Sequence, residues 1–252
     1  MADTERDARA TADRFARNFR TYSAEAQVQR RAAERLVAEL AAIAPDRRWG
    51  RVVELGCGTG VLTRAFLRRF PCQSLQLFDL AGNCPEYLAD LADVRCSFTC
   101  ADLDDLQRLP PAELVLSSSC LQWLKDPVRL FRVIRSALPR GGVFAASAFS
   151  AGNLGELGLC GGRPLPCPPA EVWRGWIEEG GFAVRRFAAW RETLRFASPL
   201  SALRHLKRTG VLIPANGGYR EVRRFLDRYE TLRTGGTVPL TYCPVLWIAE
   251  KQ

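Results

Sequence analysis

The chain has 252 residues, of which 47% are hydrophobic and 25% charged, and its formal net charge at pH 7 is +9. This length suits one large α/β domain, and no apolar run approaches the ~20 residues that a membrane span requires. The N-terminal stretch is charged throughout and lacks the apolar core of a signal peptide, so we expect a cytoplasmic protein without membrane contact.

Residues 1–44 are predicted to form a helical lid. Residues 1–20 are polar and loosely helical, and an apolar stripe that begins at Ser23 predicts a helix that Pro45 ends. Tyr22 lies just before this helix, and Gln29 lies two turns into it. Tyr22 is interpreted either as an aromatic residue that packs at the start of the helix or as a lid residue over a ligand.

Residues 45–150 are predicted to form the ligand-binding core, which begins with an apolar strand over 51–55. The strand carries Glu54 and runs into the turn Gly56-Cys57-Gly58-Thr59-Gly60, and a helix over 60–70 follows. Glycines permit positive φ and let a ligand approach the backbone. A dinucleotide fingerprint would need a further glycine where Val61 stands, and the carboxylate of Glu54 would repel a pyrophosphate. A phosphate-free ligand with a cationic amino group, such as S-adenosylmethionine (SAM), suits this turn, and the stretch resembles the first motif of class I SAM-dependent methyltransferases.

Two later strands also end at acidic residues. The strand over 74–79 ends in Asp79, where α/β nucleotide-binding folds place a carboxylate for ribose hydroxyls. The strand over 94–100 is followed by Asp102 and Leu103, which suit the amine and the ring of an adenine, although a lone Asp after a strand is more often a turn residue. We add Gln29, Leu80 and Ser118 to the expected cofactor site.

The remaining strands complete the prediction of an α/β fold. Near-continuous apolar strands over 114–117 and 143–149 alternate with a helix that begins at Pro127, which predicts a parallel sheet covered on both faces. Residues 151–235 are expected to form a substrate-covering loop and helices with late strands, and residues 236–252 one final strand. Within that last segment Pro244 favours an edge position.

The sequence offers few side chains for acid–base catalysis. His205 is the only histidine and is interpreted as a surface or helix-packing residue, and the nine cysteines have no paired spacing, so we expect no metal site. A substrate carboxylate is already ionised at neutral pH and needs only alignment and water exclusion. Nucleic-acid methylation is the rival use of the same cofactor, but Ser-Ser-Ser-Cys follows the fourth strand in place of the motifs of amino- or C5-methylating enzymes.

Several motifs outside the glycine turn resemble the malonyl-[acyl-carrier-protein] O-methyltransferases of biotin synthesis. The similarity covers about residues 15 to 250 and is carried by Tyr22 with Gln29, Leu121-Gln122-Trp123, Gly152-Asn153-Leu154-Gly155-Glu156-Leu157, Leu203 to Gly210 and Leu240-Thr241-Tyr242. The L-Q-W motif also occurs in trans-aconitate methyltransferases, so the late motifs are the more specific ones.

The resemblance implies a class I SAM-dependent methyltransferase fold, a Rossmann-like seven-stranded mostly parallel sheet flanked by helices, with the last strand antiparallel. It implies methyl transfer from SAM to the free carboxylate of malonyl-[acyl-carrier protein], or of malonyl-CoA, with S-adenosylhomocysteine as product and with no nucleic acid or metal involved. Tyr22, Gln122 and Trp123 are expected to position the reactants, and Arg204, Lys207 and Asn153 to contact the substrate or the acidic carrier. We expect a monomer. A methyltransferase of free small acids and a non-catalytic protein of this fold remain the alternatives.

Overall fold

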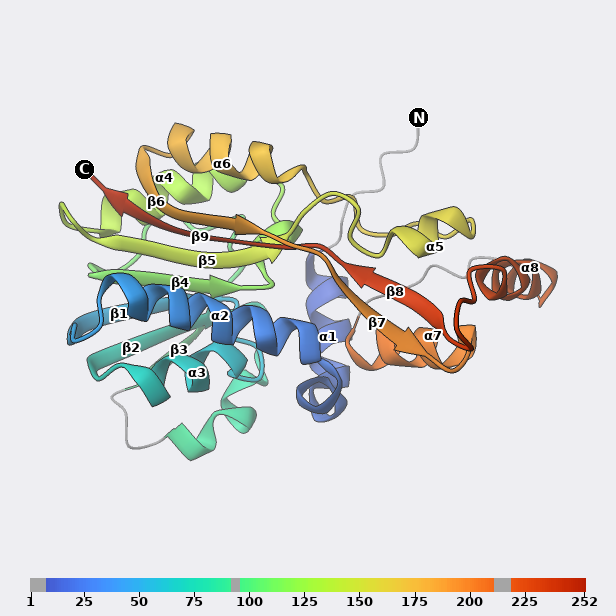
Figure 1. Cartoon of the computed structure of the whole chain (residues 1–252). Helices are drawn as coiled ribbons and strands as arrows, with labels where there is room; N and C mark the ends of the chain where they lie inside the picture. Colours follow the sequence, from blue (N-terminus) through green and yellow to red (C-terminus); the bar gives the residue numbers. More distant parts are fainter. Residues whose placement is uncertain (1–7, 92–95, 211–218) are drawn as a thin grey trace.

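The computed structural model describes residues 8–91, 96–210 and 219–252 (Figure 1). Its centre is a seven-stranded sheet with the order β3-β2-β1-β4-β5-β9-β6. Strands β1 to β5 run parallel to one another, whereas β9 is antiparallel to both β5 and β6. The expected mostly parallel sheet with an antiparallel last strand is therefore confirmed. The strands span β1 Trp49–Leu55, β2 Cys72–Asp79, β3 Cys96–Cys100, β4 Leu114–Ser118, β5 Val143–Phe149, β6 Phe182–Ala189 and β9 Pro244–Lys251.

Helices cover both faces of this sheet (Figure 1). Helices α2 (Gln27–Ile43) and α3 (Val61–Arg69) pack on one face, and α4 (Pro127–Ala137) and α6 (Ala170–Glu179) pack on the other. Alternate residues of a strand enter opposite cores, so Leu114 and Leu116 pack under α2 and α3 while Val115 packs under α4. None of the helices in the described ranges combines the length and apolar character needed to cross a bilayer.

A smaller layer lies beyond the carboxyl ends of the parallel strands (Figure 1). Here β7 (Glu192–Phe196) and β8 (Val238–Tyr242) form a separate antiparallel pair, which packs with α5 (Gly155–Leu159), α7 (Pro199–Arg208) and α8 (Tyr219–Glu230). Leu157, Leu206 and Tyr229 are buried in the core of this layer.

The end of the chain differs from the prediction of one edge strand. The structure has two strands separated at Cys243, and each belongs to a different sheet. The edge position proposed for Pro244 is wrong, because β9 lies between β5 and β6. A proline is tolerated there because Pro244 is the first residue of the strand.

The N-terminal helices also begin and end at other residues than predicted. Helix α1 spans Ala8–Glu25 and is followed by a break at Ala26 before α2, so Tyr22 lies in the last turn of α1 rather than before the first helix. Residues 1–7 of the expected lid lie outside the described residues, as do the first two residues of the strand expected over 94–100.

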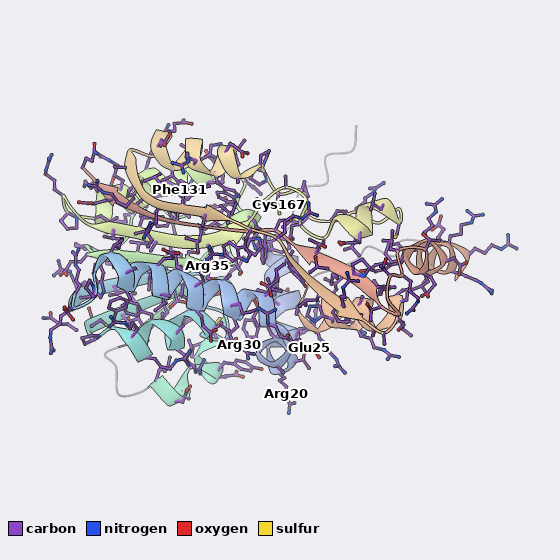
Figure 2. All side chains as sticks on the ribbon, in the orientation of Figure 1. Arg20, Glu25, Arg30, Arg35, Phe131 and Cys167 are labelled. Carbon is purple, nitrogen blue, oxygen red and sulfur yellow. The ribbon has the colours of Figure 1, made fainter. Side chains whose placement is uncertain are left out.

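Two arginines of α2 make contacts within the protein. Arg31 forms an ion pair with Glu192, and the guanidinium of Arg35 lies 4.2 Å from the ring centroid of Trp190. Figure 2 shows Arg30 and Arg35 along α2, with Arg20 on α1. These contacts attach α2 to the segment that joins the two sheets.

Candidate active site

A cavity lies at the carboxyl ends of the central strands, beside α1. It contains about 1130 Å³ of space between atoms, part of which is open solvent. Its lining residues are Phe15, Phe19, Tyr22, Gln29, Glu54, Gly56, Cys57, Gly58, Thr59, Val61, Leu62, Asp79, Leu80, Asp102, Leu103, Asp104, Ser118, Ser119, Cys120, Trp123 and Leu124. Twelve of the cofactor and positioning residues predicted from the sequence are therefore brought together in one cavity.

The glycine turn after β1 forms the floor of this cavity. Gly56 and Gly58 have φ values of 74° and 51°, in the left-handed region that glycine adopts without strain. A Cβ on Gly56 would overlap the side chain of Cys120, whereas a Cβ on Gly58 would meet nothing within 4 Å. Gly56 is thus required for packing, and Gly58 leaves bare backbone beside open space.

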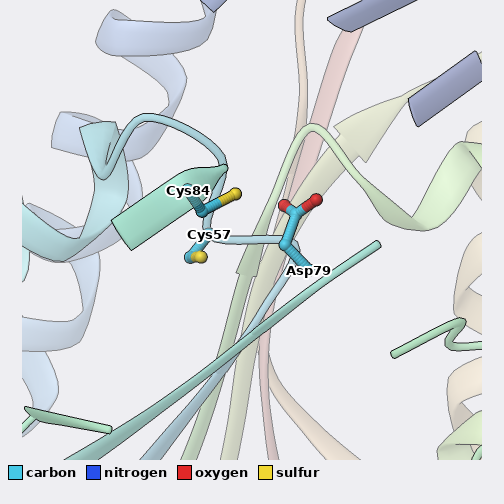
Figure 3. A group of neighbouring side chains, drawn as sticks. All are labelled: Cys57, Asp79 and Cys84. Atoms are coloured by element: carbon cyan, nitrogen blue, oxygen red, sulfur yellow. The ribbon is translucent and has the colours of Figure 1, made fainter. Parts of the chain in front are cut away.

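Two carboxylates stand at the ends of β1 and β2. Asp79 accepts hydrogen bonds from the amides of Gly58 (2.8 Å) and Ala81 (2.9 Å), which ties the end of β2 to the glycine turn. Burial raises the pKa of Asp79 above its usual range. Figure 3 shows its carboxylate beside the thiols of Cys57 and Cys84.

Glu54 is almost completely buried, with an exposed fraction of 1%, and burial raises its pKa to about 8. Its Oε2 atom and the Oε1 atom of the buried Gln29 have no hydrogen-bond partner among the described residues. Buried acceptors without a partner are costly, so both oxygens favour a ligand that brings donors into the cavity.

The loop after β3 has a defined shape that Arg129 maintains. Asp102 accepts a hydrogen bond from the amide of Asp104 (2.9 Å), which is the turn role considered from the sequence, and it also lines the cavity. From α4, the guanidinium of Arg129 donates to the carbonyl oxygens of Leu103 (2.9 Å), Asp104 (2.5 Å) and Leu106 (2.6 Å). Arg129 is a positioning residue that the sequence analysis missed.

Aromatic side chains from α1 cover one side of the cavity. The ring of Phe15 lies 6.2 Å from that of Tyr22 and 5.6 Å from that of Trp123, measured between centroids. Burial raises the pKa of Tyr22, so its phenol stays protonated at neutral pH. Phe15 and Phe19 were missed within a stretch interpreted as loosely helical, although positions 15, 19 and 22 already have the spacing of one helix face.

Five predicted site residues do not line the cavity. Gly60 is the N-cap of α3 with a φ of 79°, and a Cβ there would overlap Leu88. Gln122 donates to the carbonyl oxygen of Ser119 (2.7 Å), and Asn153 accepts from the amide of Cys243 (3.1 Å). These three hold the backbone near the cavity. The other two, Arg204 and Lys207, are exposed on α7.

His205 confirms the helix-packing interpretation rather than the surface one. Its exposed fraction is 3%, and its Nε2 atom lies 3.0 Å from the hydroxyl of Tyr242. Burial lowers its pKa, and it is not among the cavity-lining residues. A histidine held in this way gives the cavity no general base.

Comparisons with known proteins agree with this geometry. A family model described as a methyltransferase domain matches residues 24–207. The malonyl-[acyl-carrier protein] O-methyltransferase of Chlorobium phaeovibrioides is 36% identical over 250 residues, covering 95% of both chains. That of Chlorobium luteolum is 34% identical over 253 residues, covering 95% of this chain and 94% of the relative.

One solved structure illustrates the shared fold. Haemonchus contortus phosphoethanolamine N-methyltransferase 2, in complex with phosphomonomethylethanolamine and S-adenosylhomocysteine, matches with a TM-score of 0.53 at 17% identity, covering 86% of this chain and 52% of that one. Taken with the full-length relatives, the cavity and the sheet order lead to one assignment: the chain belongs to the family of the malonyl-[acyl-carrier protein] O-methyltransferases.

Proposed function

We propose that the cavity binds SAM. The unpartnered oxygens of Glu54 and Gln29 suit the donors of a cationic ligand, and the open backbone at Gly58 leaves room for it. Asp79 retains further acceptor capacity for ribose hydroxyls, and Asp102 with Leu103 and Leu80 would hold the adenine. The fit of these groups to a ligand with an ammonium, a ribose and no phosphate supports the proposal.

The reaction that follows is transfer of a methyl group to a carboxylate. When bound, SAM supplies an activated methyl group, which passes to one carboxylate oxygen of the substrate and leaves S-adenosylhomocysteine. Because the oxygen is already ionised, no side chain has to remove a proton. Phe15, Tyr22 and Trp123 would exclude water and align the reactants, and Gln122 would act indirectly by holding the backbone at Ser119.

The proposed substrate is the malonyl thioester of an acyl carrier protein, with malonyl-CoA as the simpler form. The names of the full-length relatives support this choice. Arg204 and Lys207 are exposed on α7, which belongs to the smaller layer beyond the parallel strands, so they suit contact with an acidic carrier. Asn153 would position the 150–154 loop instead of touching substrate. The methyl ester would mask a charge early in pimeloyl and biotin synthesis, and the enzyme would act as a monomer.

One observation carries the proposal: Glu54, Asp79 and Asp102 line the same cavity as the glycine turn. The relatives that match over nearly the whole chain are named for this activity. An assay with SAM and malonyl-carrier, malonyl-CoA, trans-aconitate or RNA, read by mass spectrometry, tests it. We expect a methyl ester on the malonyl carrier. Methylation of the free acid or RNA alone, or no product from an active carrier, would contradict the proposal.

Carrier contact is tested with matched arginine variants. Arg204→Ala should raise the KM for malonyl-carrier severalfold and leave SAM affinity unchanged, because the side chain lies outside the cavity. Arg140→Ala is the control, since this arginine is also exposed but precedes β5 at the opposite end of the sheet. Equal effects of the two variants would argue against docking on α7.

A further inference from the structure

The fold brings together two thiols and a carboxylate that lie far apart in the sequence. Cys57 comes from the glycine turn, Asp79 from the end of β2, and Cys84 from the short helix η1 (Cys84–Tyr87). Their sulfur atoms and a carboxylate oxygen all lie within 4.8 Å of one another. Figure 3 shows the two sulfurs one above the other beside the carboxylate of Asp79.

This cluster is buried in surroundings that favour a cation. Cys84 is fully buried and Cys57 is 4% exposed. Cys57 and Asp79 line the cavity, so an ion can reach the cluster from the cavity. Glu54 lines the same cavity with a buried oxygen that has no partner. The guanidinium of Arg64 is bound to Asp90 and to the carbonyl oxygens of Tyr87 and Thr59. Its positive charge is therefore already paired with a carboxylate.

We propose that Cys57, Asp79 and Cys84 form a binding site for a thiophilic divalent cation such as Zn²⁺ or Cd²⁺. Two sulfurs and one oxygen supply three positions of a tetrahedron, and the fourth faces the cavity. Metal–ligand bonds of about 2.0–2.3 Å would require the donors to close by on the order of 1 Å. Rotation of the two cysteine side chains would supply this movement, because the amides of Gly58 and Ala81 hold the carboxylate of Asp79. Binding displaces one proton from each thiol to solvent and leaves the metal with its three ligands at a net charge of −1.

The location gives the site a consequence for the enzyme. Asp79 is also the proposed partner of the SAM ribose, so a cation held by Asp79 and SAM should exclude each other. This consequence rests on the proposed function, whereas the metal site itself rests only on the three side chains. The thiol pair is therefore a point at which a soft metal ion inhibits the enzyme.

A Cd²⁺ titration of the full chain, kept reduced with a phosphine, tests the site through the thiolate-to-metal absorption band. We expect a band that saturates at one Cd²⁺ per chain in the wild type. Cys84→Ser should bind at least ~10-fold more weakly, because a ligand is lost. Cys160→Ser is the matched control, since Cys160 is also buried and free but belongs to the core beneath α5. The proposed site would be overturned if Cys84→Ser bound Cd²⁺ as tightly as the wild type, or if Cys160→Ser lost as much Cd²⁺ affinity as Cys84→Ser.

Calorimetry with SAM separates this inference from the proposed function. Zn²⁺ should weaken SAM binding at least tenfold in the wild type and in Cys160→Ser but less than twofold in Cys84→Ser. Cys84→Ala is a second variant with the same expected result, and circular dichroism verifies the fold of each. Unchanged SAM binding in the presence of saturating metal would refute the competition. If no SAM binds at all, the proposed function fails, and the Cd²⁺ titration still tests the metal site.

Discussion

The Nδ1 atom of His205 on α7 lies 3.2 Å from Oε2 of Glu25, in the last turn of α1. The other carboxylate oxygen of Glu25 accepts from Arg208 (2.7 Å), and the hydroxyl of Thr21 donates to the carbonyl oxygen of Arg208 (3.1 Å). Tyr22, which lines the cavity, belongs to the same turn. The helix that covers the cavity is therefore attached to the helix that carries the proposed carrier-binding residues.

This attachment predicts a pH-dependent contribution of His205 to stability. Burial lowers the pKa of His205, so the unfolded chain takes up this proton more readily than the folded one. The contribution of His205 to the free energy of unfolding is complete above the pKa of about 6.5 in the unfolded chain, and it declines as the pH falls below that value. Hydrogen bonding to Arg208 lowers the pKa of Glu25, so the loss from Glu25 comes at lower pH.

His205→Gln should therefore reduce the free energy of unfolding at pH 7.5 by roughly 1–3 kcal/mol, and by less at pH 5.5. Urea unfolding at the two pH values measures this difference. A gap between variant and wild type that stays constant or widens at pH 5.5 would contradict the assignment.

Arg129 is predicted to support cofactor binding without touching the cofactor. Arg129→Lys cannot reach all three carbonyl oxygens of the loop after β3, so SAM affinity should fall severalfold and Tm should also fall. Arg132→Lys on the same helix is the control, because its exposed ion pair with Glu179 lies away from the cavity. The prediction is refuted if both variants bind SAM like the wild type.

The two glycines of the floor should respond differently to alanine. Gly58→Ala should weaken SAM binding with a stability loss of about 1–2 kcal/mol from its positive φ, because its Cβ enters open space. Gly56→Ala should destabilise the fold more, because its Cβ would overlap Cys120. Thermal unfolding should show that adding Cys120→Gly recovers part of the loss. If the double variant recovers no stability, the overlap with Cys120 is not the cause of the loss in Gly56→Ala.

Glu54 predicts a link between SAM binding and proton release. Because its pKa is raised to about 8, the free protein carries the proton at pH 7, and a cationic ligand favours the ionised form. Affinity should fall as the pH drops below 8, by at most about tenfold per pH unit. Calorimetry in buffers of different ionisation enthalpy should detect this proton release. The amino group of SAM also titrates, and it does so with the wild type and with Glu54→Gln alike. Glu54→Gln should therefore lose only the part of the pH dependence that is due to Glu54.

The sequence predicted the parts of the site that depend on strand ends. Parallel strands place their carboxyl ends at one edge of a sheet, so Glu54, Asp79 and Asp102 were expected together and do line one cavity. Residues that act across long separations were beyond such reasoning. Neither the contact of Arg129 with the loop after β3 nor that of His205 with Glu25 follows from local spacing.

The errors in the fold arose where local patterns compete. Pro244 suggested an edge strand, but the chain changes sheets at Cys243, and this change depends on the pairing of β8 with β7. The charged residues of α1 concealed the apolar spacing of Phe15, Phe19 and Tyr22. These rings line the cavity. A helix can therefore present one apolar face to a site even when its overall composition is polar.

Calorimetric titration of SAM into the wild type and Asp79→Asn tests the proposed cofactor site most directly, with Asp46→Asn, an exposed acid between α2 and β1, as control. We predict one SAM per chain, with binding ~10- to 100-fold weaker in Asp79→Asn only, because hydrogen bonds to a charged group are lost. Absence of SAM binding in the wild type, or wild-type affinity in Asp79→Asn, would contradict the account.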